Sequence, residues 1–513
     1  MKRFNKLAYG LCALMLMGSC AGDYLDTKPT SSTGTSTIFE TTENAALAIN
    51  GINKLTTRQF LETQGMNGEG TIKMYYGNYA GNHFYVNLPG WSSIINAQYN
   101  ESVSSVYCYY PWYYYYMIIG NANAIIMNID EAKGTQSERE FIKAQALTYR
   151  AYAYTMLAQI YCYRWSDSNN GTSQGLVLRL DTSTGDMPLS TLAQVYTTIY
   201  DDLTNAISLF GTSGKHRSKN YDMDIEVAYA IYARAALNRQ DYATAASMAE
   251  KARKDHPLMT NDEYKAGFCN ANQEWIWSSY GALDETLHYY SYFSYMAYNS
   301  SASAVRSYPK CISKELYAKI PATDIRKGLF LDPGNMSYTA STGKAGTALD
   351  KYARANYPAI QSNATVYAYM QYKVAATEMP GVGNLNHFRS AEMYLIEAEA
   401  KYFSNDPTGA QNALIALNKT SGRDATYTCT KTGDALLSEI KTYRAIELWG
   451  EGFDWFDMKR WGDPIVRKSP DQGGNFLAAL AVTIAPNERN KWTWKIPLKE
   501  SDYNPALNGA LPE

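Results

Sequence analysis

The sequence contains few histidines, no paired cysteines and no block of basic residues. Its five histidines, at positions 83, 216, 256, 288 and 387, follow no zinc-motif spacing. Seven cysteines are scattered over 513 residues, which excludes a disulfide framework and a cysteine-based zinc site. The net charge is −2 without any Lys- or Arg-rich run, so nucleic acid binding has no electrostatic basis. We therefore expect no metal, no cofactor and no nucleic acid partner.

Long apolar runs are also absent, apart from a short one near the N-terminus. Residues 7–17 are apolar, follow a basic start and are too few to cross a bilayer, which predicts a signal peptide over residues 1–19. The run ends in MGSC, which resembles the lipobox of bacterial lipoproteins, although Met stands where Leu is usual. We expect Cys20 to carry a lipid anchor and residues 20–37 to form a flexible tether. The alternative is an ordinary signal peptide with a chance cysteine.

Aromatic residues, by contrast, are abundant. The chain has 45 Tyr, 14 Phe and 10 Trp, within a hydrophobic content of 46% that suffices for a large core. Tyrosine combines an apolar face with a polar tip, so it suits core edges, interfaces and surfaces on which sugars stack. The composition therefore suggests a binding surface without locating it.

Helical periodicity recurs along the chain and predicts pairs of helices. Between residues 225 and 257, alanines at helical spacing flank a turn at 238–241, and this spacing resembles a tetratricopeptide repeat. Such pairs cannot bury their apolar faces alone, so we expect them to stack into a scaffold. The predicted helical segments are 113–130, where Pro111 is placed to start the helix, 138–163, 191–210, 225–257, 390–418 and 434–460.

Two irregular segments interrupt this helical pattern. In the second, only short runs such as Glu274–Ser278 and Thr365–Val374 have strand character. Irregular segments of this length are functional or disordered, and their aromatic content argues against disorder. We expect one globular domain over residues 38–513. Its helical scaffold is predicted at about 38–64, 105–257 and 388–460, and its variable, loop-rich ligand region at about 65–100 and 258–387.

A charged stretch, residues 444–462, lies near the C-terminus and contains five aromatic residues. On helical geometry its charges share one face, which is compatible with a buried ion-pair network or with an acid–base pair of the kind that glycoside hydrolases use. Each acid has an Arg or Lys within helical reach, so we favour the network and expect no catalytic residue. The predicted network consists of Arg444, Glu447, Glu451, Asp454, Asp457 and Arg460.

One further match to a catalytic motif has the wrong context. Residues 171–175, GTSQG, fit the G-x-S-x-G pattern of serine hydrolases. That motif works on a sharp turn from a strand into a helix, whereas this one follows a predicted helix and precedes an apolar run. We therefore predict an ordinary loop.

Tyrosine-rich loops are the best candidates for ligand binding. Flat rings on exposed loops can stack on the CH-rich faces of sugars, while neighbouring amides bind the hydroxyl groups. The alternative is that these rings fasten the loops to the scaffold, and we interpret the tyrosines between 107 and 116 as core or scaffold. The candidate ligand-binding residues are Tyr75, Tyr76, Asn78, Tyr79, His83, Tyr85 and Trp91 in the first irregular segment, and Tyr289, Tyr290, Tyr292 and Tyr295 in the second.

Several short runs, taken in order, resemble the SusD/RagB family of Bacteroidetes outer-membrane lipoproteins. They are Cys20 followed by DYLD at 23–26, Ala122-Asn123, Arg150-Ala151-Tyr152, HFRSAE at 387–392, EAEA at 397–400, the charged stretch itself, KIPL at 495–498 and Asn504-Pro505. Each run is weak by itself, but together they cover essentially the whole chain.

This resemblance implies both a fold and a role. The fold would be mainly α, with tetratricopeptide-like helix pairs forming a right-handed scaffold against an irregular, loop-rich half with short β elements. The role would be a non-enzymatic lipoprotein on the outer membrane, facing the exterior, that captures oligosaccharides and delivers them to a TonB-dependent, SusC-like transporter. Two alternatives remain: the same role for peptides or another non-sugar nutrient, and a tetratricopeptide scaffold that binds proteins.

Overall fold

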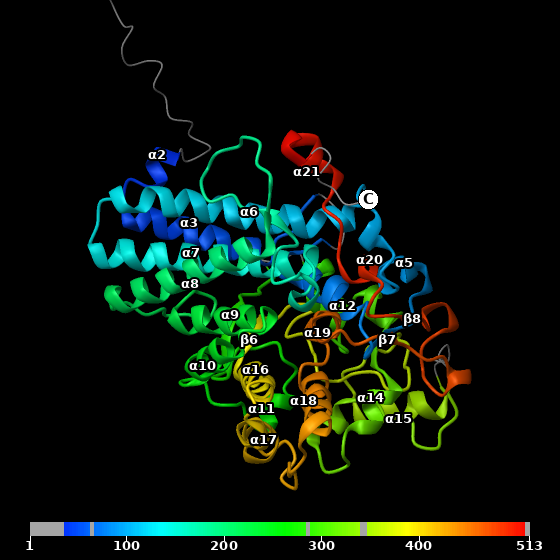
Figure 1. Cartoon of the computed structure of the whole chain (residues 1–513). Helices are drawn as coiled ribbons and strands as arrows, with labels where there is room; N and C mark the ends of the chain where they lie inside the picture. Colours follow the sequence, from blue (N-terminus) through cyan, green and yellow to red (C-terminus); the bar gives the residue numbers. More distant parts are fainter. Residues whose placement is uncertain (1–34, 62–65, 284–287, 339–345, 508–513) are drawn as a thin grey trace, which may run out of the picture.

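The computed structural model describes residues 35–61, 66–283, 288–338 and 346–507 (Figure 1). The predicted signal peptide, Cys20 and all but the last three residues of the predicted tether lie outside these ranges. Within the described part, no helix is both long enough and apolar enough to cross a membrane.

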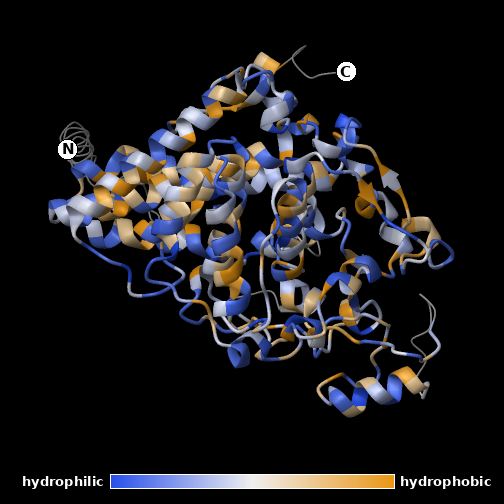
Figure 2. Cartoon of the chain, turned by 60° about the horizontal axis from the view of Figure 1, so that its bottom comes forward, coloured by the Kyte–Doolittle hydropathy of each residue, from blue (hydrophilic) through white to orange (hydrophobic). Residues whose placement is uncertain are grey.

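Helices packed side by side form one half of the molecule, which confirms the mainly α prediction. α3, α6, α7 and α8 lie next to one another, α9 and α10 follow, and α16 to α18 extend the array (Figure 1). These helices carry both apolar and polar residues, as expected when one face packs inward (Figure 2). Their bounds are α3 Thr42–Leu55, α6 Val106–Asn128, α7 Gln136–Tyr161, α8 Leu192–Ser213, α9 Ile225–Asn238, α10 Tyr242–Arg253, α16 Ser390–Phe403, α17 Pro407–Ile415, α18 Gly433–Glu447 and α19 Asp454–Trp461.

The α9–α10 pair forms around the predicted turn. α10 begins after Asp241, whose carboxylate accepts the Thr244 N–H at 3.3 Å and so caps the helix. Ala233 on α9 and Ala245 and Ala252 on α10 are completely buried. Because alanine has no side chain beyond Cβ, the two helices approach closely.

α6 begins earlier than predicted, at Val106, so Pro111 lies inside the helix. Proline has no N–H and therefore cannot bond to the Tyr107 carbonyl one turn earlier. The Tyr76 hydroxyl donates to this carbonyl at 2.5 Å instead. A residue from another segment thus replaces the missing helical hydrogen bond, and local sequence gives no sign of it.

Short helices and two-stranded antiparallel sheets make up much of the remaining described chain. The sheets pair β1 Phe84–Val86 with β5 Lys310–Ile312, β2 Gln174–Val177 with β3 Leu189–Thr191, β4 Trp275–Ser279 with β6 Leu385–Arg389, and β7 Ile465–Val466 with β8 Thr483–Ile484. The short helices are α2 Thr35–Ile38, α4 Gly68–Thr71, α5 Ser92–Ile95, α11 Asn261–Lys265, α12 Tyr292–Met296, α13 Ser303–Arg306, α14 Lys314–Lys319, α15 Ala348–Asn356, α20 Arg489–Trp492 and α21 Leu498–Tyr503.

Of the two runs predicted to have strand character, one forms a strand. β4 lies where the run at 274–278 predicted it, and it pairs with β6, which leads directly into α16. The run at 365–374 makes only isolated bridges. Its amides bond in turn to different segments, with Gln371 N–H donating to Lys310 O and Tyr372 N–H to Leu329 O, so no continuous ladder forms.

Residues 68–78 are helical and buried, although the sequence predicted a loop. α4 is followed directly by a π-helix, η1 Ile72–Asn78, and every residue of both elements is buried. Gly77 allows this packing, because a side chain there would overlap the Gly452 carbonyl. The aromatic residues of this segment therefore enter the core, while Gly77 and Asn78 contact the turn that follows α18.

Candidate functional site

The charged stretch lies in a buried ion-pair network. Glu447, the last residue of α18, accepts hydrogen bonds from Arg389 Nη1 at 2.6 Å and from Arg326 Nη1 at 2.7 Å. Glu451, in the turn that follows, accepts from Arg389 Nη2 at 2.7 Å and from Lys373 Nζ at 2.6 Å. All five side chains are buried, and Arg389 joins the two glutamates.

These pairings keep the two glutamates ionised. Burial by itself would raise the pKa of Glu447, but Arg389 and Arg326 outweigh it and hold that pKa below its ordinary value. Burial would likewise raise the pKa of Glu451, but the charges of Arg389 and Lys373 outweigh it and lower that pKa. A general acid at neutral pH needs a raised pKa. This carboxylate pair therefore lacks the electrostatic property on which the hydrolase alternative depends.

The helix after the turn carries a second group of ion pairs. Asp457 accepts from Arg444 Nε at 2.7 Å and from Arg460 Nη1 at 2.6 Å, and Arg460 also binds Glu399 of α16 at 2.8 Å. Asp454 differs, because its carboxylate accepts the backbone N–H of His83 at 2.6 Å and is not paired with a cation among the described residues. Burial raises the pKa of Asp454 to about 7.

The network differs in two ways from the helical stripe that the sequence predicted. Gly450 and Gly452 have φ of 79° and 93° and interrupt the helix, so the six charges lie on α18, a turn and α19. Lys459, expected to pair with the acids, instead donates to the carbonyls of Gln159 and Cys162 at 2.6 and 2.7 Å.

The cations that bind the two glutamates come from distant parts of the chain, and spacing gave no indication of Arg326 or Lys373. The single local signal was Arg389, within the HFRSAE run.

The π-helix η1 holds the turn between α18 and α19 in place. The Asn78 amide donates to Gly450 O and accepts the Gly452 N–H, both at 2.9 Å. The Tyr292 hydroxyl donates to the same Gly450 O at 2.7 Å. Asn78 and Tyr292 are both buried, and their polar groups are already engaged in holding this turn. Asn78 and Tyr292, both predicted to bind the ligand, are therefore poorly placed to contact it.

Other predicted ligand residues are also enclosed. Tyr75, Tyr76, Tyr79 and Tyr85 are at most 2% exposed, so the expectation that they project from loops is wrong. The reason is the helical, buried course of residues 68–78 and the pairing of β1 with β5. Burial lowers the pKa of His83 to about 4, and its carbonyl accepts the indole N–H of Trp449 at 2.9 Å.

The two predicted groups of aromatic residues nevertheless meet at the surface. Trp91, Tyr99, Tyr107 and Tyr295 are partly exposed, and we call these four residues the aromatic cluster. The ring centroids of Trp91 and Tyr107 lie 6.1 Å apart, and those of Tyr99 and Tyr107 lie 5.1 Å apart.

Buried Tyr75 lies beneath this cluster and connects its parts. Its ring centroid is 5.0 Å from that of Trp91, 6.0 Å from that of Tyr107 and 6.2 Å from that of Tyr295. The first irregular segment supplies Trp91, and α12 of the second supplies Tyr295. Rigid underlying rings hold the exposed ones in fixed orientations, as a stacking surface for a flat ligand requires.

Partial burial and neighbouring phenol groups raise the pKa values of two tyrosines in this cluster. Burial raises the pKa of Tyr107, with Tyr99 and Tyr295 adding to the effect. Burial also raises the pKa of Tyr295, and nearby Tyr290 contributes. The hydroxyl groups therefore remain protonated and able to donate hydrogen bonds at neutral pH. Tyr289, beside them in sequence, is 60% exposed.

Sequence reasoning missed two members of the aromatic cluster. Tyr107 was interpreted as scaffold because it belongs to the Tyr-rich start of α6, and Tyr99 was not considered. The usable signal was the position of Tyr107 in the first turn of a helix, where side chains are less enclosed than in its middle. Tyr109 is half-exposed for the same reason, with Lys499 Nζ 4.5 Å above its ring.

The remaining sequence candidates are placed as follows. Gly171 to Ser173 form a turn that leads into β2, which confirms the loop predicted for the G-x-S-x-G match. In the described ranges, no group of three or more His, Cys, Asp or Glu residues is arranged to hold a metal ion.

Two family models together match most of the chain. The model described as "Starch-binding associating with outer membrane" matches residues 23–237, and the model described as "SusD family" matches residues 240–508, which is more than half of the chain. The chain belongs to the SusD family. Among curated proteins, none matches it.

Solved structures share this SusD-family fold over nearly their whole length. A SusD-like carbohydrate-binding protein from Bacteroides vulgatus is 25% identical, with a TM-score of 0.75 over 93% of this chain and 99% of that one. A SusD superfamily protein from Bacteroides thetaiotaomicron is 22% identical, with a TM-score of 0.71 over 91% and 98%. One from Bacteroides fragilis is 20% identical, with a TM-score of 0.67 over 92% and 100%. The last two likenesses concern the fold alone.

Proposed function

We propose that this SusD-family protein is a non-enzymatic, glycan-binding lipoprotein of the outer membrane. It captures an oligosaccharide at the cell exterior and delivers it to a TonB-dependent, SusC-like transporter. Cys20 carries the lipid anchor. The family descriptions and the carbohydrate-binding relative from Bacteroides vulgatus support the class of ligand, and the membrane association in the first description supports the location.

The observation that carries the proposal is the aromatic cluster. Trp91, Tyr99, Tyr107 and Tyr295 offer ring faces that are partly open to solvent and held from below by Tyr75. Their phenol groups supply hydrogen bonds beside the faces. Sugars have apolar CH faces and polar edges, so both parts of the ligand find partners on this surface.

The test measures glycan binding by calorimetry. Wild-type protein is titrated with a panel of oligosaccharides, and the best ligand is then titrated into Trp91→Ala and Tyr107→Ala. Loss of a central aromatic contact should weaken binding by roughly tenfold or more. Tyr352→Ala removes a ring that is 47% exposed on α15 and serves as the matched control, which should retain wild-type affinity.

Three results would contradict the proposal. Binding that survives both Trp91→Ala and Tyr107→Ala would place the site elsewhere. Binding of peptides without any glycan would favour the peptide-capture alternative. Release of reducing sugar by the purified protein would show an enzyme. Delivery to a transporter is tested separately, by co-purification of the lipidated protein with an outer-membrane barrel and by the loss of this complex when Cys20→Ala removes the anchor.

A further inference from the structure

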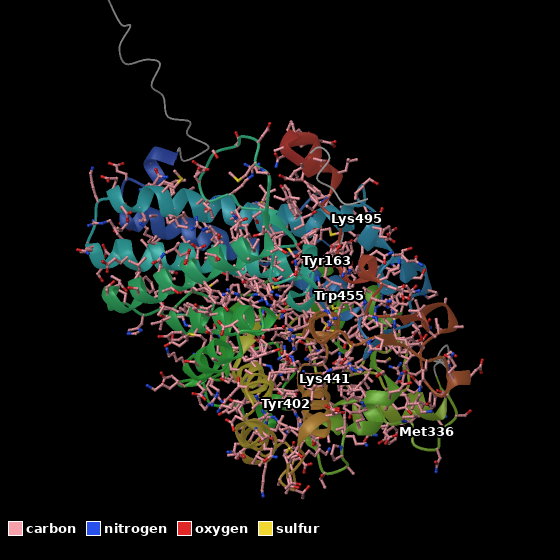
Figure 3. The ribbon with its side chains drawn as sticks, in the orientation of Figure 1. Tyr163, Met336, Tyr402, Lys441, Trp455 and Lys495 are labelled. Atoms are coloured by element: carbon pink, nitrogen blue, oxygen red, sulfur yellow. The ribbon has the colours of Figure 1, made fainter. Side chains whose placement is uncertain are left out.

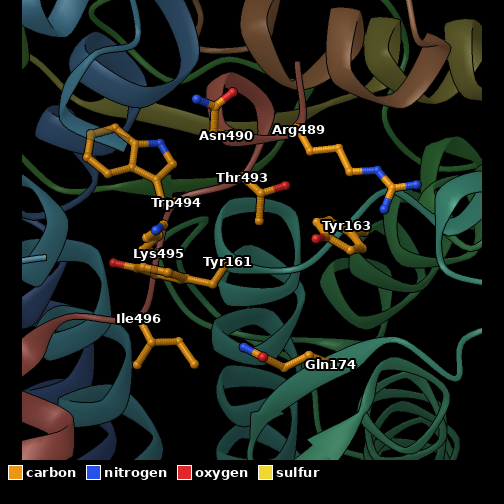
Figure 4. A pocket seen from close by; sticks show the side chains of 9 residues that line it. All are labelled: Tyr161, Tyr163, Gln174, Arg489, Asn490, Thr493, Trp494, Lys495 and Ile496. Carbon is orange, nitrogen blue, oxygen red and sulfur yellow. The ribbon is translucent and has the colours of Figure 1, made fainter. Parts of the chain in front are cut away.

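One cavity of the described chain lies beside the C-terminal segment 489–496. It has a volume of about 260 Å³ and lies between the end of α7 and the segment that contains α20 (Figure 4). None of the four cluster residues lines it. One water needs only about 10–15 Å³ of such volume, so the cavity can admit part of a small organic ligand. Tyr163 and Lys495 lie on opposite sides of it, in the part of the molecule between α7 and the C-terminal segment (Figures 3 and 4).

Two cations of this cavity have no acidic partner. The Arg489 guanidinium lies 5.0 Å from the centre of the Tyr163 ring, and it makes no hydrogen bond or ion pair with any described residue. The backbone of Lys495 is fixed, because its N–H donates to Asn100 O at 2.9 Å and its carbonyl accepts the Cys108 thiol at 2.9 Å. Its ammonium group, however, has no partner among the described residues.

Nearby carboxylates do not neutralise these charges. No Asp or Glu lines the cavity. Glu488, next to Arg489 in sequence, accepts the Ala485 N–H at 2.7 Å. Asp167 lines an adjoining cavity that shares Tyr163 and Arg489, but its carboxylate is paired with Arg164 at 2.8 Å. The lining therefore carries an excess of positive charge in a protein whose net charge is −2.

Two neutral polar side chains of the cavity are also available. The side chains of Gln174 and Thr493 make no hydrogen bond within the described part of the chain. Trp494 also lines the cavity, and its buried ring is held in place by packing on Tyr76 with centroids 4.9 Å apart. The cavity thus combines two unpaired cations, neutral donors and acceptors, and an aromatic wall, which is the mixture that small-molecule sites use for orientation and contact.

We propose that this cavity is a second ligand site and that it binds an acidic saccharide, a sugar ring that bears a carboxylate or a sulfate. The anionic group binds Arg489 and Lys495 through charge-assisted hydrogen bonds. Gln174 and Thr493 bind ring hydroxyls, and the ring lies against Trp494. The choice of a saccharide rests on the proposed function, whereas the negative charge follows from the unpaired cations.

The experiment compares matched acidic and neutral ligands by calorimetry. A galacturonic acid trisaccharide is titrated against the corresponding neutral galactose trisaccharide, with a sulfated trisaccharide to distinguish the two anions and with inorganic sulfate alone. The protein variants are wild type, the double variant R489A/K495A, and Lys351→Ala as a control that removes an exposed positive charge on α15. Trp91→Ala is included as a variant of the aromatic cluster.

The proposal predicts that wild type binds at least one acidic trisaccharide more tightly than the neutral one. R489A/K495A should lower this affinity by about tenfold or more, as the loss of charge-assisted hydrogen bonds requires. Lys351→Ala and Trp91→Ala should bind the acidic trisaccharide at this cavity as tightly as wild type does. Moderate salt should weaken the interaction, because ions screen exposed charges.

Different failures identify different errors. If neutral glycans bind in a Trp91-dependent way but acidic ones bind no better, the proposed function stands and this inference is wrong. If R489A/K495A behaves like Lys351→Ala, the site is not this cavity. If inorganic sulfate binds as tightly as the acidic trisaccharides, the saccharide assignment is wrong. If no glycan of either kind binds, the proposed function itself fails.

Discussion

The network around Glu447 and the cavity beside Tyr163 both contain arginine and lysine side chains. In the network these cations are paired with carboxylates, whereas in the cavity they are not. In the network, Arg389 binds Glu274, Glu447 and Glu451 at 2.6–2.8 Å. In the cavity, the Arg489 guanidinium lies 5.0 Å from the centre of the Tyr163 ring and has no acidic partner among the described residues. A buried charge is costly unless it is paired and hydrogen-bonded, whereas Arg489 is exposed, so water can solvate its charge without a protein partner.

This contrast separates charges that hold the fold from charges that can bind a ligand. The charged stretch is conspicuous in the sequence, yet Glu447, Glu451 and Asp457 are all paired with buried cations. Arg489 and Lys495 are inconspicuous, yet their charged groups have no acidic partner among the described residues. Four changes test this distinction, in order of decreasing expected effect.

Glu447→Ala should have the largest effect on stability. It leaves Arg389 and Arg326 buried without one of their carboxylate partners, so we expect the free energy of unfolding to fall by roughly 3–5 kcal/mol in denaturant titrations. Asp434→Ala on the same helix is the control. Asp434 is exposed in the first turn, and its loss should cost no more than about 1 kcal/mol. Unchanged stability of Glu447→Ala together with lost ligand binding would contradict the structural role.

Asn78→Ala tests the contact between the π-helix and the turn after α18. The change leaves Gly450 O without one donor and the Gly452 N–H without its acceptor, so unfolding should become easier by about 1–3 kcal/mol. Exposed Asn50→Ala should change stability much less. If Asn78→Ala instead abolished glycan binding at wild-type stability, Asn78 would be a ligand contact after all.

Asp454→Asn should show its effect only as a dependence on pH. The pKa of Asp454 in the folded protein, about 7, lies above its ordinary value, so proton binding favours the folded state at low pH. This contribution is lost as pH rises through about 7. Between pH 5 and pH 8, the stability of Asp454→Asn relative to wild type should therefore improve by about 2–3 kcal/mol. A constant difference at both pH values would show that Asp454 is ionised throughout.

Arg489→Ala should have almost no effect on stability when no ligand is present. The Arg489 guanidinium makes no ion pair or hydrogen bond within the described ranges. Its loss should therefore change the free energy of unfolding by no more than about 0.5 kcal/mol. This is the opposite of the Glu447→Ala result. A large destabilisation would place Arg489 with the structural charges and weaken the case for the second site.

The sequence predicted much of the scaffold and little of the binding surface. The alanine spacing at 233, 245 and 252 and the turn at 238–241 correspond directly to α9 and α10. The helical segment predicted at 434–460 also forms, as α18 and α19 with a turn at Gly450 and Gly452 between them. In contrast, Tyr75 and Trp91 looked alike in the sequence, both on Gly- and Asn-rich segments, and only the second reaches the surface.

The sequence by itself determined the family, the helical pairs and the abundance of aromatic residues, because these depend on short-range periodicity and on ordered local motifs. Only the tertiary structure decided which rings are covered and which charges are paired. Exposure and pairing depend on contacts between segments far apart in the chain, such as Asn78 with Gly452 and Arg326 with Glu447. Composition places a tyrosine or an arginine in the chain, but its neighbours in space determine whether it stabilises the fold or remains free to meet a ligand.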